Sequence, residues 1–284
     1  MDKSPDPAWQ AKQMRPLVPE AVFNRYAHQE TVRADRISYR SDGLAINGFA
    51  LFPRAATNPP PVILYAHGGV AKWGRITFFD ILELFRLAER GYVVIASALR
   101  GEGGSEGRPN LGAGDRQDML NLIPLASELG EVDTKRIGLW GFSRGGGLGY
   151  RVLAATDTIR SAVLVGASAD LVTNPRRAEF DKHVYRGIVD NYLADPDEAL
   201  RALSAAYWPE KIAANTEILL VHGASDDRVQ VTNSLTMAAH LSQLNRRYEL
   251  LIPESGSHTL IEHQHRVREA IDRWFDRSLA PTKL

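Results

Sequence analysis

Short apolar runs rich in β-branched residues alternate with longer segments of helical periodicity along this chain, from residue 36 onward. Parallel strands need long crossover connections, which helices usually supply. The alternation therefore predicts an α/β fold, with a mostly parallel central sheet and helices on both of its faces. Eight segments are predicted as strands, and most of the later ones are continuous apolar runs, as expected of strands buried on both faces. They are residues 36–39, 45–52, 62–66, 92–98, 137–140, 162–165, 218–221 and 248–252.

A turn and two amphipathic segments extend this prediction. Ser41-Asp42-Gly43 is typical of a tight turn and separates the first two predicted strands, so we expect an antiparallel hairpin at one edge of the sheet. Residues 78–90 and 267–275 carry their apolar side chains on one helical stripe, which predicts helices packed against the sheet.

One connection is much longer than the others. Residues 169–214 separate two predicted strands, and unstructured connections of that length are uncommon in compact domains. We expect a helical insert here, with Pro175, Pro196 and Pro209 each in the first turn of a short helix. Because open α/β sheets bind ligands at the carboxyl ends of their strands, the insert is predicted to be a lid over the site. The alternative is a segment that faces solvent and takes no part in binding.

The start of the chain has a different character. Residues 1–35 are predicted to form an N-terminal arm outside an α/β domain that spans residues 36–278, with the insert at 169–214 inside it. Several prolines lie among the first nineteen residues, and no apolar stretch there resembles the core of a signal peptide. We expect a cytoplasmic location by default, although a protein that had lost a leader peptide would look the same.

The composition excludes several classes of function. The 34 Lys and Arg residues balance 34 Asp and Glu residues, so no basic surface for nucleic acid is expected. Cysteine is absent, which excludes a thiolate nucleophile, disulfides and thiolate metal sites. Apolar runs are far shorter than the roughly 18 residues of a membrane-spanning helix. No pattern predicts a cofactor, and His258, His263 and His265 lack the spacing of a helical zinc site, so no metal is expected.

The strongest catalytic signal is Gly141-Phe142-Ser143-Arg144-Gly145, which directly follows the strand at 137–140 and precedes a helical segment. A strand, a sharp turn and a helix around G-x-S-x-G form a nucleophile elbow, in which the serine hydroxyl projects from the sheet edge. The flanking glycines keep other side chains away from the strained serine backbone. The alternative is a glycine-rich helix start that binds an anion at its N-terminus.

A serine nucleophile needs a base and a group that orients the base. His258 follows the last predicted strand, and Asp226 follows the strand at 218–221. The resulting order of Ser143, Asp226 and His258, each after its own strand, is that of the α/β-hydrolase triad. Asp227 and Asp170 also follow strands and remain alternatives for the acid.

The reaction also needs donors for the developing oxyanion, which backbone N–H groups usually supply. One is expected from Arg144, the residue after the nucleophile, and the other from the glycine loop after the strand at 62–66, with Gly69 preferred over Val70. Val70, Trp73 and Phe142 are predicted to line the substrate pocket. The Arg144 side chain is expected to form a surface ion pair. Glu102 and Glu106 are weaker candidates for contact with a cationic substrate group.

Taken together, these motifs resemble the α/β-hydrolase superfamily and, within it, the catalytic domain of the prolyl oligopeptidase family. The resemblance spans roughly residues 36–276. In that family the first aspartate after His-Gly-x-x is the triad acid, which favours Asp226. The motifs that carry the resemblance are Ser41-Asp42-Gly43, His67-Gly68-Gly69, residues 100–107, residues 141–146, His222 to Val229 and Gly256-Ser257-His258.

The predicted function is that of a serine hydrolase that forms an acyl-enzyme. We expect it to cleave carboxylic esters of small substrates, because esters need less leaving-group assistance than amides and because fewer than forty residues precede the sheet, too few for the β-propeller of full family members. The alternative is a serine peptidase that acts on short peptides or aminoacyl amides. A third reading is a ligand-binding relative without catalytic activity.

Overall fold

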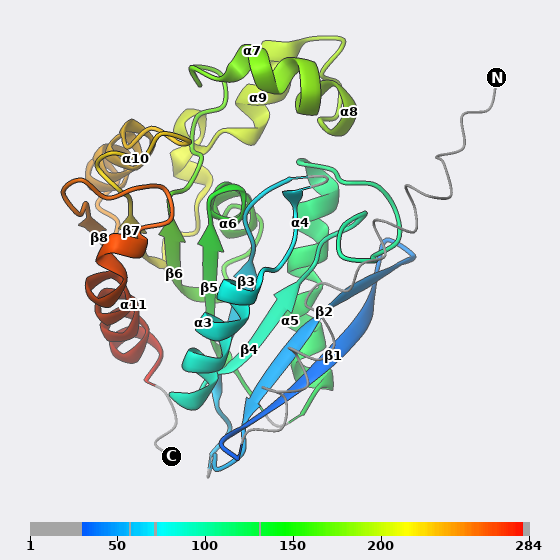
Figure 1. The fold of residues 1–284 in the computed structure, drawn as a ribbon, viewed down its shortest axis with the longest axis vertical. Helices are drawn as coiled ribbons and strands as arrows, with labels where there is room; N and C mark the ends of the chain where they lie inside the picture. The colour runs from blue at the N-terminus through cyan, green and yellow to red at the C-terminus, as the bar shows by residue number, and fades with distance from the viewer. Residues whose placement is uncertain (1–29, 57, 71–72, 131, 281–284) are drawn as a thin grey trace.

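A computed structural model describes residues 30–56, 58–70, 73–130 and 132–280 (Figure 1). Residues 1–29 of the predicted N-terminal arm lie outside the described residues. Residues 32–35 belong to the first strand, β1 (Val32–Ser41), which therefore begins earlier than the sequence predicts. Val32 and Ala34 are buried and continue the alternating pattern of the strand, which explains the earlier start.

An eight-stranded sheet forms the centre of the molecule, in the order β1-β2-β4-β3-β5-β6-β7-β8. β1 pairs with β2 as an antiparallel hairpin, β2 pairs antiparallel with β4, and the other neighbours are parallel. The predicted mostly parallel sheet with a hairpin at one edge is therefore confirmed. Its further strands are β2 (Leu44–Pro53), β3 (Pro61–Ala66), β4 (Val93–Ser97), β5 (Asp133–Phe142), β6 (Ile159–Val165), β7 (Glu217–Val221) and β8 (Tyr248–Leu251).

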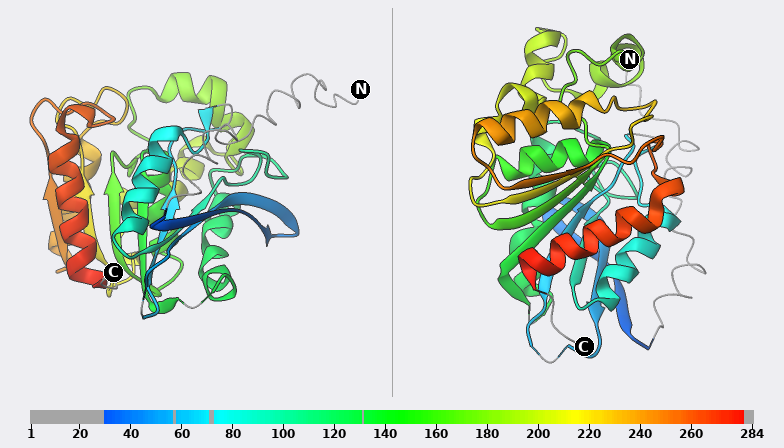
Figure 2. Two further views of the ribbon diagram at one scale, coloured as in Figure 1. Left: turned by 60° about the horizontal axis from the view of Figure 1, so that its bottom comes forward. Right: turned by 90° about the vertical axis from the view of Figure 1, so that its left-hand side faces the viewer.

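Helices cover both faces of this sheet, because its central strands are apolar on both sides (Figure 2). Helices α3 (Phe78–Glu89) and α11 (Gln264–Leu279) pack on one face and share a hydrophobic core with it. The opposite face is covered by α4 (Ala113–Leu120), α5 (Leu122–Glu128), α6 (Arg144–Leu153) and α10 (Thr232–Gln243). None of the helices in the described part of the chain is long and apolar enough to cross a membrane.

The long connection between β6 and β7 is a helical insert that lies above the carboxyl ends of the parallel strands (Figure 1). Pro196 lies in the first turn of its longest helix, where Asp195 accepts a hydrogen bond from the Glu198 N–H at 3.0 Å. The insert has a small hydrophobic core of its own, which includes Tyr185 and Leu200. Its elements are α7 (Arg177–Phe180), the π-helix η2 (Asp181–Tyr185), α8 (Arg186–Ile188), α9 (Pro196–Leu203) and the 3-10 turns η3 (Ala205–Tyr207) and η4 (Pro209–Lys211).

Candidate active site

Ser143 lies at a sharp turn between β5 and α6, with φ +55° and ψ −117°, a strained conformation for a residue with a side chain. The turn is held to the neighbouring strand β6, since the Ser143 N–H donates to Val165 O at 2.8 Å. A Cβ atom on Gly145 would lie only 1.9 Å from Ala66 O, so α6 approaches β3 too closely for any side chain there. The glycines of the motif are therefore required by packing as well as by the turn.

Three side chains form a continuous chain of hydrogen bonds at the carboxyl ends of the strands. His258 Nδ1 lies 2.7 Å from Asp226 Oδ2, and His258 Nε2 lies 2.9 Å from Ser143 Oγ. An ionised carboxylate only accepts hydrogen bonds, so Nδ1 carries the proton and Nε2 accepts from the serine hydroxyl. The imidazole is thus oriented as a base toward Ser143.

The environment of Asp226 keeps its carboxylate ionised. Burial raises the pKa of Asp226, but hydrogen bonds from His222, from His258 and from the Val229 backbone lower it more, and the net pKa lies well below the ordinary value. The second carboxylate oxygen, Oδ1, accepts from the backbone N–H groups of Arg228 and Val229, each at 2.9 Å. These contacts fix the carboxylate plane toward the imidazole.

The other two candidate acids have different environments. Asp227 is exposed on the loop. Asp170 accepts from the Val172 N–H and the Thr173 hydroxyl, each at 2.8 Å, and so stabilises the start of the insert. Asp226 is the carboxylate in contact with His258.

The prediction that the Arg144 side chain forms an ion pair at the surface is wrong. It is buried, with Nη1 2.8 Å from Glu102 Oε2 and Nη2 2.6 Å from Asp115 Oδ2. Nη1 also donates to Gly69 O at 2.9 Å, which joins the glycine loop to the first turn of α6. Position 144 faces the core because α6 packs closely on the sheet, which the sequence pattern alone does not show.

The two glutamates proposed for a cationic substrate group have structural contacts instead. Glu102 is 2% exposed and is held by Arg144. Glu106 accepts from the Ala45 N–H at 2.8 Å, beside the edge hairpin. Neither belongs to the lining of the cavity described next.

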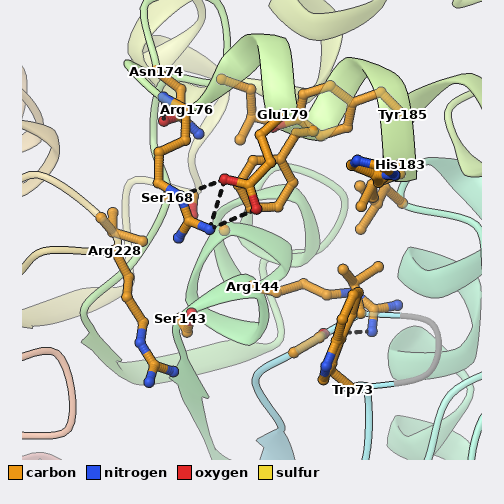
Figure 3. Close-up of a pocket in the computed structure, with 18 of the residues that line it drawn as sticks. Trp73, Ser143, Arg144, Ser168, Asn174, Arg176, Glu179, His183, Tyr185 and Arg228 are labelled. Atoms are coloured by element: carbon orange, nitrogen blue, oxygen red, sulfur yellow. Dashed lines mark hydrogen bonds and ion pairs between the residues drawn. The ribbon is translucent and has the colours of Figure 1, made fainter.

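A cavity of about 540 Å³ lies between Ser143 and the insert (Figure 3). The residues predicted to bind substrate, Val70, Trp73 and Phe142, all line it, as do Ser143 and His258. Trp73 is 58% exposed. Leu171, Phe180 and Tyr185 of the insert line the cavity as well, so the insert contributes to the wall of the site, as predicted for a lid.

Sequence reasoning missed several polar residues of this cavity. In Figure 3, Arg176 and Glu179 extend from the insert into the cavity, on the side that lies across from Ser143. Arg151 lies on α6, eight residues after Ser143, and no sequence pattern indicated that it would line the cavity. The polar lining residues absent from the predictions are Arg151, Ser168, Asn174, Arg176, Glu179, His183 and Arg228. Within the described ranges, no three His, Asp or Glu side chains are grouped so as to hold a metal ion.

The sheet order and the elbow define this protein as a serine hydrolase with the α/β-hydrolase fold, as predicted. The chain belongs to the prolyl oligopeptidase family, whose family model matches residues 77–282, and the resemblance seen in its motifs is thus confirmed.

Similar proteins in this family carry peptidase names. The uncharacterized peptidase YtmA of Bacillus subtilis (strain 168) is 27% identical over 77% of this chain and 83% of its own length. A probable dipeptidyl-aminopeptidase B of Aspergillus terreus is 25% identical over 81% of this chain, but only 26% of its own length is covered. The acylaminoacyl peptidase of Pyrococcus horikoshii has the same fold, with a TM-score of 0.76 and 24% identity over 93% of this chain and 44% of that one.

Proposed function

We propose that the protein is a serine peptidase that cleaves short peptides or aminoacyl amides through an acyl-enzyme. The observation that carries the proposal is the hydrogen-bond chain from Asp226 through His258 to Ser143. Membership of a peptidase family favours amide over ester substrates, contrary to the preference drawn from the sequence. A similar solved structure is an acylaminoacyl peptidase in complex with Z-Gly-Gly-Phe-chloromethyl ketone, a peptide inhibitor, which also supports this choice.

In the proposed mechanism, the Ser143 hydroxyl attacks the substrate carbonyl while His258 Nε2 takes its proton. Asp226 holds the imidazole in the required tautomer and stabilises its positive charge. His258 then donates the proton to the leaving amine, and the acyl-enzyme forms. A water molecule, deprotonated by the same imidazole, attacks the acyl carbonyl and releases Ser143.

The oxyanion that forms during attack is assigned to two backbone donors. Arg144 is the first residue of α6, and the N–H groups of a first helical turn have no acceptor within their own helix. The second donor is the N–H of Gly69, with that of Val70 as the alternative. The hydrogen bond from Arg144 Nη1 to Gly69 O supports this assignment, because it holds the glycine loop beside the elbow.

Substrate contacts are assigned to Val70, Trp73 and Phe142 on the sheet side of the cavity. The Phe142 ring lies 5.2 Å from the His258 ring, centroid to centroid, so it also covers the base. A cavity of about 540 Å³ suits a few amino-acid residues rather than a folded protein chain.

The test compares purified protein with its Ser143→Ala variant on aminoacyl and short-peptide amides and on short-chain aryl esters. We expect amide turnover by the wild type and a loss of roughly a thousandfold or more in the variant. Turnover of esters without amides would overturn the peptidase proposal in favour of an esterase. Fluorophosphonate labelling that persists in Ser143→Ala would show that the nucleophile is misassigned.

A further inference from the structure

Arg151 is a buried arginine that the proposed mechanism does not use. It is 7% exposed, it lies on α6, and it lines the cavity that contains Ser143. Nη1 donates to Leu203 O at the end of α9, at 3.3 Å. Nε is buried and has no hydrogen-bond partner within the described part of the chain. Burial of a charge with so few partners costs free energy of folding.

The position of Arg151 on the helix directs it toward the nucleophile. Gly147 and Arg151 lie four residues apart on one face of α6, and Ser143 is the N-cap of the same helix. Helical side chains tilt toward the N-terminus of the helix, here toward Ser143. Gly147 carries no side chain, and a Cβ there would lie 2.7 Å from Ser168 O. Position 147 therefore adds no side chain to the part of the cavity wall that α6 forms between Ser143 and Arg151 in the sequence.

Two described arginines that line the cavity are buried, Arg144 and Arg151, and neighbouring charges neutralise Arg151 less than Arg144. Arg144 is paired with Glu102 and Asp115, and Arg176 is paired with Glu179 at 2.9 Å. Arg228 is exposed, so solvent screens its charge. The described residues that line the cavity include four arginines, Arg144, Arg151, Arg176 and Arg228, and one acidic residue, Glu179.

The pKa of Arg151 agrees with a buried guanidinium that is poorly neutralised. Burial lowers the pKa of Arg151 to about 10, Asp115 opposes that shift, and Arg144 and Arg116 add to it. The guanidinium is still protonated near neutral pH, in a site where a positive charge is poorly solvated. A carboxylate that enters the cavity would supply the missing partner and accept charge-assisted hydrogen bonds.

We propose that Arg151 binds the carboxylate side chain of an Asp or Glu residue whose own carbonyl Ser143 attacks. The proposal rests on the proposed peptidase function and names the substrate class of the same site. The leaving amine must lie beside His258, which protonates it, so the side chain on the acyl side faces the other wall of the cavity. Gly147 and Arg151 line the same cavity, and we assign them to that wall.

The test uses two peptide aminomethylcoumarin amides that differ only in Glu or Gln at the residue supplying the scissile carbonyl. The wild type should prefer Glu by roughly 10- to 100-fold in kcat/KM, as expected for hydrogen bonds to a charged group. Arg151→Met should abolish this preference, and Arg151→Lys should retain part of it. The preference is a ratio measured on one protein, so partial unfolding of a variant does not change it.

A matched control is Arg246→Met, which removes another arginine whose buried Nε has no partner in the described structure but which does not line the cavity. This control should keep the preference for Glu. A wild type that shows no preference, or an Arg151→Met variant that keeps it, would overturn the proposal and indicate a purely structural arginine.

A second readout separates this proposal from the peptidase proposal. Should neither amide be cleaved, the peptidase function fails, and the subsite is then tested by protection of Ser143 from a fluorophosphonate. N-acetylglutamate should protect the wild type at a lower concentration than N-acetylglutamine does, and Arg151→Met should remove this difference. Equal protection by the two compounds overturns the carboxylate subsite itself.

Discussion

His222 Nε2 lies 3.2 Å from Asp226 Oδ2, the same carboxylate oxygen that contacts His258 Nδ1. His222 is fully buried, and its Nε2 also lies 2.8 Å from Val229 O. Both neighbours are acceptors, so Nε2 carries the proton, and Nδ1 accepts from the Ser234 hydroxyl at 2.7 Å. The carboxylate that we propose as the triad acid therefore lies between two histidines, and we assign His222 a positioning role.

Replacement of His222 tests this positioning role. His222→Leu removes a donor to a buried carboxylate, and we expect kcat/KM to fall by roughly 10- to 100-fold. Ser234→Ala removes only the partner of Nδ1 and should cost less. Steady-state kinetics with a peptide substrate, alongside thermal unfolding, check the prediction. An unchanged kcat/KM in His222→Leu would mean that the contact has no role in orienting Asp226.

Asp226→Asn should lower kcat by roughly ten-thousandfold, because an amide in place of the carboxylate favours the wrong imidazole tautomer. The loss should be much smaller in Asp227→Asn, whose side chain is exposed. Rates for the two variants on one substrate decide between the neighbouring aspartates. Equal losses in both would contradict the assignment of Asp226 as the acid.

The lowered pKa of Asp226 also predicts how stability depends on pH. Folding favours the ionised carboxylate, so its contribution is complete above the unfolded pKa of about 3.9 and is lost as pH falls below it. Urea denaturation should show a difference in unfolding free energy between wild type and Asp226→Asn that stays constant from about pH 5 to about pH 8. The difference should become less favourable to the wild type below about pH 4. A difference that grows on acidification would contradict the lowered pKa.

Arg144→Met should destabilise the protein by about 3–5 kcal/mol, because it removes the guanidinium that contacts two buried carboxylates, Glu102 and Asp115. Adding Glu102→Gln and Asp115→Asn to this variant should recover part of the loss, since the two negative charges that Arg144 neutralised are then removed. Urea denaturation of the single and triple variants measures both effects. A loss below about 1 kcal/mol would be typical of an exposed ion pair and would contradict the buried one.

Alanine substitutions at two glycines, one in α6 and one in α8, test how closely α6 packs on β3. Gly145→Ala places a methyl group 1.9 Å from Ala66 O and should cost about 3 kcal/mol or more, with loss of activity as Ser143 shifts. Gly187→Ala has nothing within 4 Å of the added atom and should be neutral or slightly stabilising. Thermal unfolding and peptide turnover of the two variants provide the comparison. A Gly145→Ala enzyme of normal stability and rate would show that α6 can move away from β3.

Much of the candidate site could be predicted because its residues follow apolar strands in turn-forming sequences. Ser143, Asp226 and His258 each lie just beyond a strand whose character is visible in the sequence, and parallel strands bring their carboxyl ends to one edge. The polar lining from the insert could not be predicted. The short helices there pack on a core of their own, and nothing in residues 169–214 shows which side chains face the cavity.

The sequence alone determined the α/β class, the strand-turn-helix elbow around Ser143 and the chain order of Ser143, Asp226 and His258, because local turn chemistry and apolar periodicity are properties of neighbouring residues. Only the tertiary structure decided that Arg144 is buried between Glu102 and Asp115, that His222 contacts Asp226 Oδ2, and that Arg151 lines the cavity. Burial and charge pairing depend on segments distant along the chain. The free energy of a charged group is set by those neighbours and not by its own position in the sequence.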